Sequence, residues 1–202
     1  MIKITYPRLI EREYTIRIVP CIEEYFRRRG FAVEWISLSP KQESRFPADE
    51  LFRVGNKIFG LQFKAAKCNG RTIYWELDKE QHNLLQNKFN GIIYYALPRF
   101  YERIGQCTGL YHTIFARPNF PYESTLKRGA MWWRYTNWGP FAEGILSCRN
   151  GKIIQGLDDQ WFDLEKFFEL YEPMLSSINL SERKMTIITK NDKIDDIDRS
   201  NQ

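Results

Sequence analysis

Residues 46–66 hold three side chains that could act together on a phosphoester: Asp49, Gln62 and Lys64. Gln62 and Lys64 are two positions apart, so on a strand they project from one face with Cα atoms about 6.6 Å apart. Asp and Gln oxygens are hard ligands suited to Mg²⁺, which takes one or two protein oxygens and keeps several waters. A lysine beside such an ion could orient or deprotonate an attacking water and stabilise developing charge. This combination predicts metal-assisted hydrolysis.

The dipeptide Gly55-Asn56 predicts how the carboxylate reaches the other two groups. It supplies the positive φ values of a tight hairpin turn between two extended segments. With the turn centred there, Asp49 pairs opposite Gln62, and a register shift of one or two positions still leaves them adjacent. A carboxylate, an amide oxygen and an ammonium group therefore converge on one strand pair.

The same three residues also fit an ordinary solvent-facing hairpin, where an Asp–Lys pair contributes little. The alternation along the second strand argues against that interpretation. Leu61, Phe63 and Ala65 share one face, whereas Gly60 and Ala66 flank the polar pair on the other. Small residues at these positions favour a crowded polar face that another backbone or a ligand approaches closely.

Pro47-Ala48-Asp49 followed by Gln62-Phe63-Lys64 resembles the signature of the PD-(D/E)XK nuclease superfamily. Over residues 12–97 the chain looks most like the archaeal Holliday junction resolvases, which cut four-way DNA junctions as dimers. The Gln-x-Lys form is also similar to that of the Mrr-type restriction nucleases, where it accompanies cleavage. The segments that carry the wider resemblance are Arg28-Arg29-Gly30-Phe31-Ala32-Val33-Glu34, Ile73-Tyr74-Trp75 and Glu80-Gln81.

The resemblance implies a role for each matching residue. Asp49 corresponds to the metal-binding aspartate, Gln62 to the second ligand and Lys64 to the lysine of the motif. The carbonyl of Phe63 is implied to face the metal, Mg²⁺ or Mn²⁺. Gln81 corresponds to a helix glutamine near the site, although it also fits the third position of a capping box after an N-cap aspartate. The neutral Gln62 is expected to weaken metal affinity relative to a glutamate.

The resemblance also implies a glutamate on the first helix, and here the match fails. The resemblance implies this glutamate eleven positions before Gly30, and the chain has Val19 there. The four candidate acids are Glu23 and Glu13, which we favour, with Glu11 and Glu24.

Five basic residues are candidates for binding nucleic acid: Lys67, Arg71, Lys127, Arg128 and Arg134. Aromatic residues lie among the last three, and they could stack on unpaired bases: Trp132, Trp133, Tyr135 and Trp138. Core packing explains most of these aromatics more simply. His82, beside Gln81 at a helix start, is expected to face solvent.

The elements that must position these residues alternate between helix and strand. Apolar spacing predicts a helix within 7–29, which Pro20 kinks or restarts and Gly30 ends. Strands are predicted at 31–38, 49–54, 57–66, 73–77 and 92–97, a loop at 39–47, and a helix capped by Asp78. Beyond residue 98, β-like segments are predicted near 112–116, 131–135 and 144–154, and an amphipathic helix at 160–175. This order predicts an α/β (α+β) fold, a mixed sheet flanked by helices, with the restriction-endonuclease-like core that the resemblance implies.

Length and composition agree with a folded enzyme or binding protein. The 202 residues, 43% of them hydrophobic, exclude a wholly disordered chain, and a net charge of +5 is compatible with DNA as a partner. We expect a nuclease-like core at 1–98, an aromatic-rich extension packed on it at 99–180 and a flexible tail at 181–202. Four dispersed cysteines predict buried free thiols rather than a zinc finger. Without an apolar leader or spanning segment, we expect an intracellular, cytoplasmic protein and no membrane partner.

Two alternatives to the endonuclease stay open. The first is a nuclease-fold protein, without efficient catalysis, that binds nucleic acid or scaffolds a partner. The second is an α/β domain that binds a small molecule or a protein, with an accidental match in the hairpin. The resemblance favours a DNA endonuclease that acts as a homodimer, with branched DNA as one candidate substrate.

Overall fold

The structure is a computed structural model that describes residues 10–43, 46–70, 72–102, 106–131 and 135–153. The chain divides into two units, Met1–Asp158 and Asp159–Gln202, and every described residue belongs to the first. The helix predicted at 160–175 and the tail predicted at 181–202 lie outside the described residues. Every helix and strand of the described residues belongs to the first unit.

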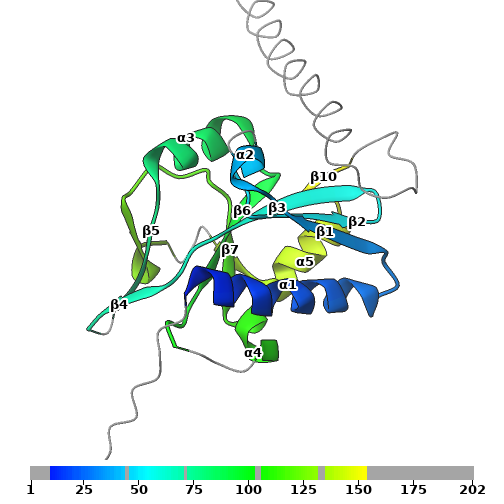
Figure 1. Cartoon of the computed structure of the whole chain (residues 1–202), viewed down its shortest axis with the longest axis horizontal. Coiled ribbons are helices and arrows are strands. Elements are labelled where there is room, and N and C mark those ends of the chain that lie inside the picture. The colour runs from blue at the N-terminus through cyan, green and yellow to red at the C-terminus, as the bar shows by residue number, and fades with distance from the viewer. Residues whose placement is uncertain (1–9, 44–45, 71, 103–105, 132–134, 154–202) are drawn as a thin grey trace, which may run out of the picture. The chain divides into compact units, whose positions relative to one another are not determined.

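A mixed sheet forms the centre of this unit (Figure 1). Along its path all neighbouring strands are antiparallel except β3 and β6, which are parallel. A further short strand, β10 (Lys152–Ile153), pairs with the beginning of β3. The path runs through β1 (Val33–Ser37), β2 (Glu50–Val54), β3 (Lys57–Phe63), β6 (Ile93–Pro98), β7 (Thr113–Ala116) and β9 (Tyr135–Asn137).

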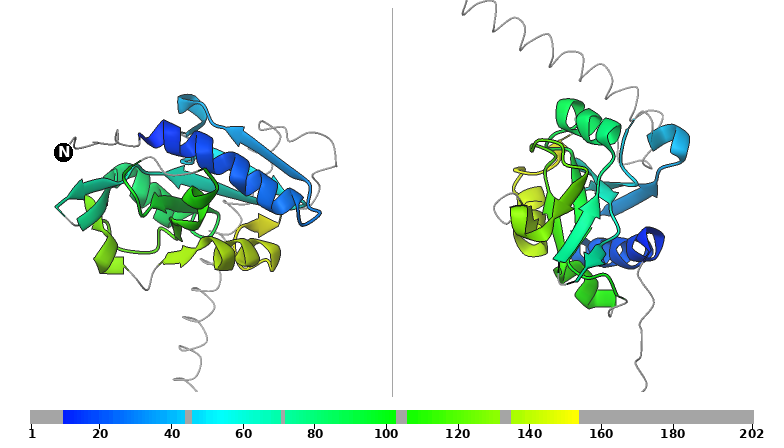
Figure 2. Two further views of the ribbon diagram at one scale, coloured as in Figure 1. Left: turned by 90° about the horizontal axis from the view of Figure 1, so that it is seen from below. Right: turned by 90° about the vertical axis from the view of Figure 1, so that its left-hand side faces the viewer.

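Helices cover both faces of this sheet, which confirms the predicted mixed α+β architecture. In Figure 1, α2 (Pro40–Glu43) and α3 (Lys79–Lys88) lie above the sheet and α1 (Glu11–Arg27) lies below it. The two shorter helices α4 (Gln106–Tyr111) and α5 (Trp138–Leu146) pack with α1. The right-hand view in Figure 2 also shows α1 and α3 on opposite sides of the sheet. Residues 40–43, predicted as part of a loop, form the single turn of α2.

A second, three-stranded sheet extends from the end of β3. Its strands are β4 (Lys67–Asn69), β5 (Thr72–Glu76) and β8 (Thr125–Lys127), in that order and all antiparallel, and a 3₁₀ turn follows at Arg128–Met131. Ile73, Trp75 and Leu126 are buried on one face, which leaves the alternate side chains on the other.

Helix α1 continues through Pro20 instead of restarting there. Pro20 and Ile16, one turn earlier, are both exposed, so the carbonyl that loses its helical partner faces water. Burial of Ile18, Ile22 and Phe26 on the opposite side holds the helix together.

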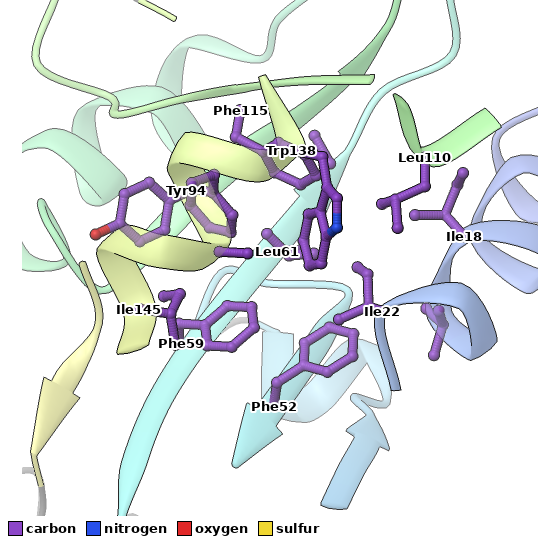
Figure 3. Close-up of a cluster of buried hydrophobic side chains, with 14 of the residues drawn as sticks. Ile18, Ile22, Phe52, Phe59, Leu61, Tyr94, Leu110, Phe115, Trp138 and Ile145 are labelled. Carbon is purple, nitrogen blue, oxygen red and sulfur yellow. The ribbon is translucent and has the colours of Figure 1, made fainter. Parts of the chain in front are cut away.

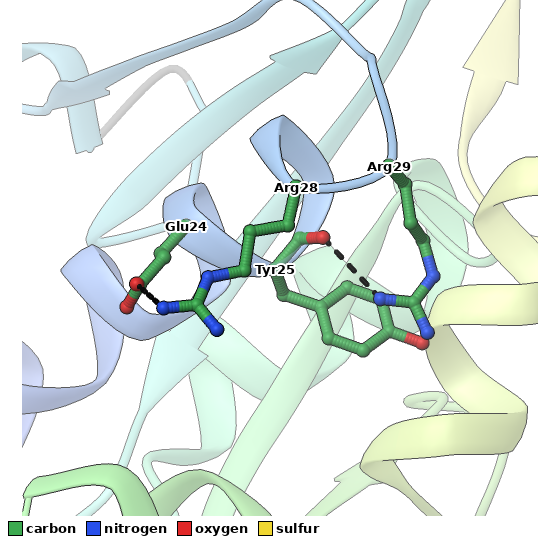
Figure 4. Close-up of polar contacts among 4 residues, drawn as sticks. All are labelled: Glu24, Tyr25, Arg28 and Arg29. Atoms are coloured by element: carbon green, nitrogen blue, oxygen red, sulfur yellow. Dashed lines mark hydrogen bonds and ion pairs between the residues drawn. The ribbon is translucent and has the colours of Figure 1, made fainter.

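The C-terminal end of α1 follows the predicted pattern. Gly30 takes φ +81°, the left-handed conformation expected just after a helix. Figure 4 shows the polar contacts of this end: Arg28 pairs with Glu24, and the Arg29 guanidinium lies 3.6 Å from the centre of the Tyr25 ring.

Of the β-structure predicted near 144–154, residues 144–146 belong instead to helix α5, whereas Lys152–Ile153 form the short strand β10. Pro140 stands in the first turn of α5, where a backbone N–H would have no helical partner. Trp138 and Ile145 join the main cluster of buried side chains (Figure 3), to which Phe141 also belongs. Trp138 and Phe141 are therefore core residues, as the simpler interpretation of the aromatic segment predicts.

The prediction of buried thiols is wrong for the cysteines that the structure describes in detail. Cys21 and Cys68 are half-buried and Cys148 is exposed, and each of the three carries a thiol that is not part of a disulfide. Within the described ranges, no helix has both the length and the apolar character needed to cross a bilayer.

Candidate metal and phosphoester site

The backbone of Asp49 is held on both sides, immediately before β2. Its N–H donates to the carbonyl of Leu61 (3.0 Å), and its carbonyl accepts from the N–H of Leu38 (3.0 Å). Glu50 pairs with Leu61 in the β2–β3 ladder, which is the predicted register, so Asp49 comes opposite Gln62. The hairpin thus places the carboxylate where the sequence predicts it.

Close packing fixes the segment that leads into Asp49. A Cβ atom added to Gly60 would meet the Ala48 Cβ at 3.0 Å, Ile93 Cγ1 at 3.1 Å and the Phe46 ring at 3.2 Å. Only glycine leaves space for this loop to lie against β3. The crowded face predicted around Gly60 is therefore present, and the approaching group is the protein's own loop.

The Asp49 carboxylate accepts three short hydrogen bonds. The Phe63 N–H donates to Oδ2 (2.6 Å), and the Gln62 amide nitrogen lies 2.8 Å from each carboxylate oxygen. Burial nevertheless raises the pKa of Asp49 to about 7, against the lowering effect of the Phe63 hydrogen bond. Because desolvation penalises the charged form, a cation at this carboxylate would be favoured.

Gln62 lies between Asp49 and a residue of α3. Its side chain is buried, at 2% exposure, so its amide requires partners on both sides. The Gln81 amide nitrogen donates to Gln62 Oε1 (2.9 Å). Asp78 caps α3 as predicted by accepting from the Gln81 N–H (2.8 Å), but the Gln81 side chain reaches Gln62 instead of completing the capping box.

Glu11 is the candidate first-helix acid that lies at this site. Its Oε2 accepts from the N–H of Ala65, just past the end of β3 (3.2 Å), and its charge raises the pKa of Asp49. Glu23 accepts from the Trp35 indole (2.9 Å) and Glu24 pairs with Arg28, both at the other end of α1. Glu13 is half-buried two positions after Glu11. The structure thus brings together Asp49 and Glu11 rather than Glu23.

Lys64 supplies positive charge to this group of acids. It is half-buried at the end of β3, and its charge lowers the pKa of Asp49 and of Glu43 on α2 against the raising effect of burial. Burial also raises the pKa of Glu50 to about 7, although a hydrogen bond from Ser37 (2.8 Å) opposes this. Neither Glu43 nor Glu50 was a predicted site residue: Glu43 comes near Lys64 and Glu11 through long-range packing, whereas Glu50 directly follows Asp49 in the chain.

His82 does not face solvent as predicted. It is fully buried, with Nδ1 3.0 Å from the Tyr95 hydroxyl and Nε2 2.8 Å from the Phe120 carbonyl. Both ring nitrogens therefore have protein partners, and His82 fixes α3 to the sheet on which Gln62 lies.

The donor set for a cation is sparse but chemically suitable. Among the described residues, no three His, Cys, Asp or Glu side chains cluster as metal ligands. Asp49, Gln62 Oε1 and the Phe63 carbonyl are oxygen donors, and Glu11 lies nearby. Mg²⁺ requires only one or two carboxylates and retains waters, so these groups fit a hard divalent cation that is largely hydrated.

Of the five basic residues predicted to bind nucleic acid, three lie in or next to the second sheet and two lie outside the described residues. Lys67 and Lys127 are directly paired with Tyr74 from either side, so the three side chains share the face opposite Trp75. Lys67 also pairs with Glu76, and Arg128 is exposed in the following 3₁₀ turn. Arg71 and Arg134, with Trp132 and Trp133, lie outside the described residues.

Comparison of the chain with models of known protein families, with curated proteins and with solved structures finds no match in any of the three.

Proposed function

We propose that this protein is a divalent-metal-dependent DNA endonuclease with a restriction-endonuclease-like, PD-(D/E)XK core. The observation that carries the proposal is the hydrogen-bonded series Asp49–Gln62–Gln81, with the charges of Glu11 and Lys64 acting on Asp49. The order of acid, amide and lysine along one hairpin corresponds to the motif that the sequence resembles.

Asp49, Gln62 and the Phe63 carbonyl would hold Mg²⁺ or Mn²⁺, with Glu11 facing its waters. The bound ion would activate a water and stabilise negative charge on the scissile phosphate. Gln62 at present directs its amide nitrogen to Asp49. Rotation of the Gln62 and Gln81 amides by about half a turn presents Gln62 Oε1 to the cation and keeps a hydrogen bond between the two side chains.

The chain's own groups account for the remaining requirements of phosphodiester hydrolysis. Asp49, whose pKa is raised to about 7, releases its proton as a cation becomes available, so activity is expected to rise with pH through neutrality. The Lys64 ammonium lies where it offsets the acidic charge, and it can orient the attacking water or stabilise the phosphate oxygens. Lys67, Tyr74 and Lys127 offer a phosphate and base contact beyond the end of β3.

A cleavage assay tests this proposal. Plasmid, linear, single-stranded and four-way-junction DNA are incubated with the protein in Mg²⁺ and in Mn²⁺. We expect cleavage that Asp49→Asn and Lys64→Ala each reduce at least a hundredfold, while Lys88→Ala, an exposed lysine at the far end of α3, is unaffected. Junction cleavage by a dimeric species would identify branched DNA as the substrate. Cleavage that persists in Asp49→Asn would contradict the assigned site.

A binding protein without cleavage activity is the second candidate. The observation that favours it is the satisfied state of Asp49, whose two carboxylate oxygens already accept from Gln62 and Phe63. In that case DNA binding would depend on Lys67 and Lys127 but not on Asp49, and added Mg²⁺ would leave the DNA intact.

A further inference from the structure

A cavity of about 540 Å³ lies on the face of the sheet opposite Gln62. Tyr94 and Phe115 line it, and they point away from Tyr95, the strand partner of Gln62. Helix α5 and the turn after it complete the walls with Phe141, Gly144 and Asn150. Its volume falls within the range of about 300–1,000 Å³ that is typical of small-molecule sites.

Two arginines give this cavity a positive character. Arg117, after β7, and Arg149, after α5, both line it, and the lining includes no Asp or Glu. Arg117 Nη2 donates to the Arg149 carbonyl (2.7 Å) and to Asn150 Oδ1 (2.9 Å). The Arg117 guanidinium is therefore held at the rim, beside the Tyr94 hydroxyl, and N–H groups that these contacts do not use can donate to a phosphate oxygen.

The turn that carries Arg149 is fixed by its own hydrogen bonds. The N–H groups of Arg149 and Asn150 donate to the Gly144 carbonyl (2.8 and 2.9 Å), and Asn150 Nδ2 donates to the Phe141 carbonyl (3.1 Å). A Cβ on Gly144 would overlap the Asn150 amide. The cavity wall is thus set by local geometry and requires no ligand to form it.

Aromatic side chains form the floor below the two arginines. Tyr94, Phe115 and Phe141 are at most 2% exposed and pack against each other, so the part of this floor that is open to a ligand is the half-buried Tyr135 with the exposed Pro140. The Tyr94 hydroxyl is used internally, since it donates to the Gly91 carbonyl (2.7 Å) and accepts from the Gly151 N–H (3.1 Å). Polar groups for orienting a ring come instead from the rim, where Asn119 and Thr136 stand.

We propose that this cavity binds a nucleotide unit, with the phosphate between Arg117 and Arg149 and the base over the aromatic floor. Two guanidinium groups without a neighbouring carboxylate in the lining select an anion, and the volume and floor accommodate a planar ring beyond it. The same chemistry occurs in a free mononucleotide and in a nucleotide of a DNA strand. The site is separate from Asp49 and does not depend on the nuclease proposal.

Isothermal titration calorimetry with the full chain tests this site. The probes are deoxyadenosine monophosphate, deoxyadenosine, inorganic phosphate and a short 5′-phosphorylated single-stranded oligonucleotide. We expect the monophosphate to bind at least tenfold more tightly than either fragment, because only it uses both the arginines and the floor. Arg117→Gln and Arg149→Gln should each weaken it about tenfold, the effect of losing one charge-assisted contact.

Two controls separate this result from other causes. Arg28→Gln removes an exposed arginine just after α1, outside the lining, and Asp49→Asn removes the metal-site carboxylate; neither should change binding of the monophosphate. If the oligonucleotide binds more tightly than the monophosphate, the natural ligand is a nucleotide of a DNA strand. If it binds equally or more weakly, the natural ligand is a free nucleotide. Either result supports the site. The proposal would be overturned if the monophosphate bound no more tightly than inorganic phosphate, or if its affinity were unchanged in both arginine variants.

Discussion

The two faces of strand β3 differ at its C-terminal end, where apolar and polar side chains alternate residue by residue. Phe59, Leu61 and Phe63 pack under α1 and α5 in an apolar cluster, whereas Gln62 on the other face joins the polar series from Asp49 to Gln81. The apolar face contributes stability through burial alone. The polar face retains a buried carboxylate whose pKa is raised to about 7, which costs stability at neutral pH. Under the proposed function, this cost in stability accompanies the cation site on the polar face.

The largest expected effect tests the apolar face. Phe59→Ala removes a fully buried ring that stacks on Phe52 and should lower the free energy of unfolding by about 3–5 kcal/mol. Urea denaturation followed by tryptophan fluorescence measures this change. Trp35→Ala removes a partly exposed aromatic ring and should cost much less. Equal losses in the two variants would contradict the assignment of the stabilising face.

Substitution of Asp49 on the polar face should raise the free energy of unfolding, whereas substitution on the apolar face lowers it. Because the folded-state pKa of Asp49 is raised to about 7, the folded chain holds a proton that the unfolded chain releases above about pH 4. The parent therefore loses stability as pH rises from about 4 to about 7, and the loss stays constant above that. Asp49→Asn removes the cost and should raise the free energy of unfolding by about 1–3 kcal/mol at pH 8.

Urea titrations of the parent and Asp49→Asn at pH 8 and pH 5 measure this effect, with Glu24→Gln, an exposed acid on α1, as the control. The gain should be smaller at pH 5. A gain that is independent of pH, or a loss at pH 8, would show that Asp49 stabilises the fold.

Glu11 and Glu23 provide a matched pair on the same helix. Glu11→Gln removes a negative charge that raises the pKa of Asp49, so that pKa should fall, and divalent-cation affinity should drop several-fold. Glu23→Gln should change neither, because Glu23 bonds to Trp35. NMR titration of the Asp49 carboxyl and Mn²⁺ titration measure the two quantities. If Glu23→Gln changed the Asp49 pKa and the cation affinity as much as Glu11→Gln does, the assignment of Glu11 to the site would be contradicted.

The smallest effect is expected at Gln81. Gln81→Ala deletes one hydrogen bond to Gln62, worth about 1 kcal/mol, and leaves the Asp78 cap intact because that cap uses the backbone N–H of residue 81. Thermal unfolding should change by only a few degrees, whereas cation affinity should fall because Gln62 loses its orienting partner. A stability loss with unchanged cation affinity would assign Gln81 a purely structural role.

Local signals in the sequence predicted the hairpin and the cap that build the site. The turn at Gly55-Asn56 sets the β2–β3 register and hence the position of Asp49 opposite Gln62. Asp78 caps α3 because an aspartate directly before a helix can accept from the N–H three positions on. In both cases the determining residues are neighbours in the chain.

Long-range packing determined what the sequence did not reveal. Glu11 meets β3 through the Ala65 N–H, 54 positions away, and no spacing rule distinguishes it from the other acids of α1. His82 is buried because Phe120 and Tyr95 close over it. Helix α5 contains Gly139, Pro140 and Gly144, which disfavour helix, although Pro140 in the first turn was an available signal of a helix start.

The binding of one divalent cation at Asp49 is the central claim, and Mn²⁺ titration followed by electron paramagnetic resonance tests it most directly. At pH 8 the parent should bind one ion per chain, with an affinity that falls as pH drops below about 7 because protons compete for the carboxylate. Asp49→Asn should reduce that affinity at least tenfold. An affinity that is the same in Asp49→Asn and in the parent would contradict the account.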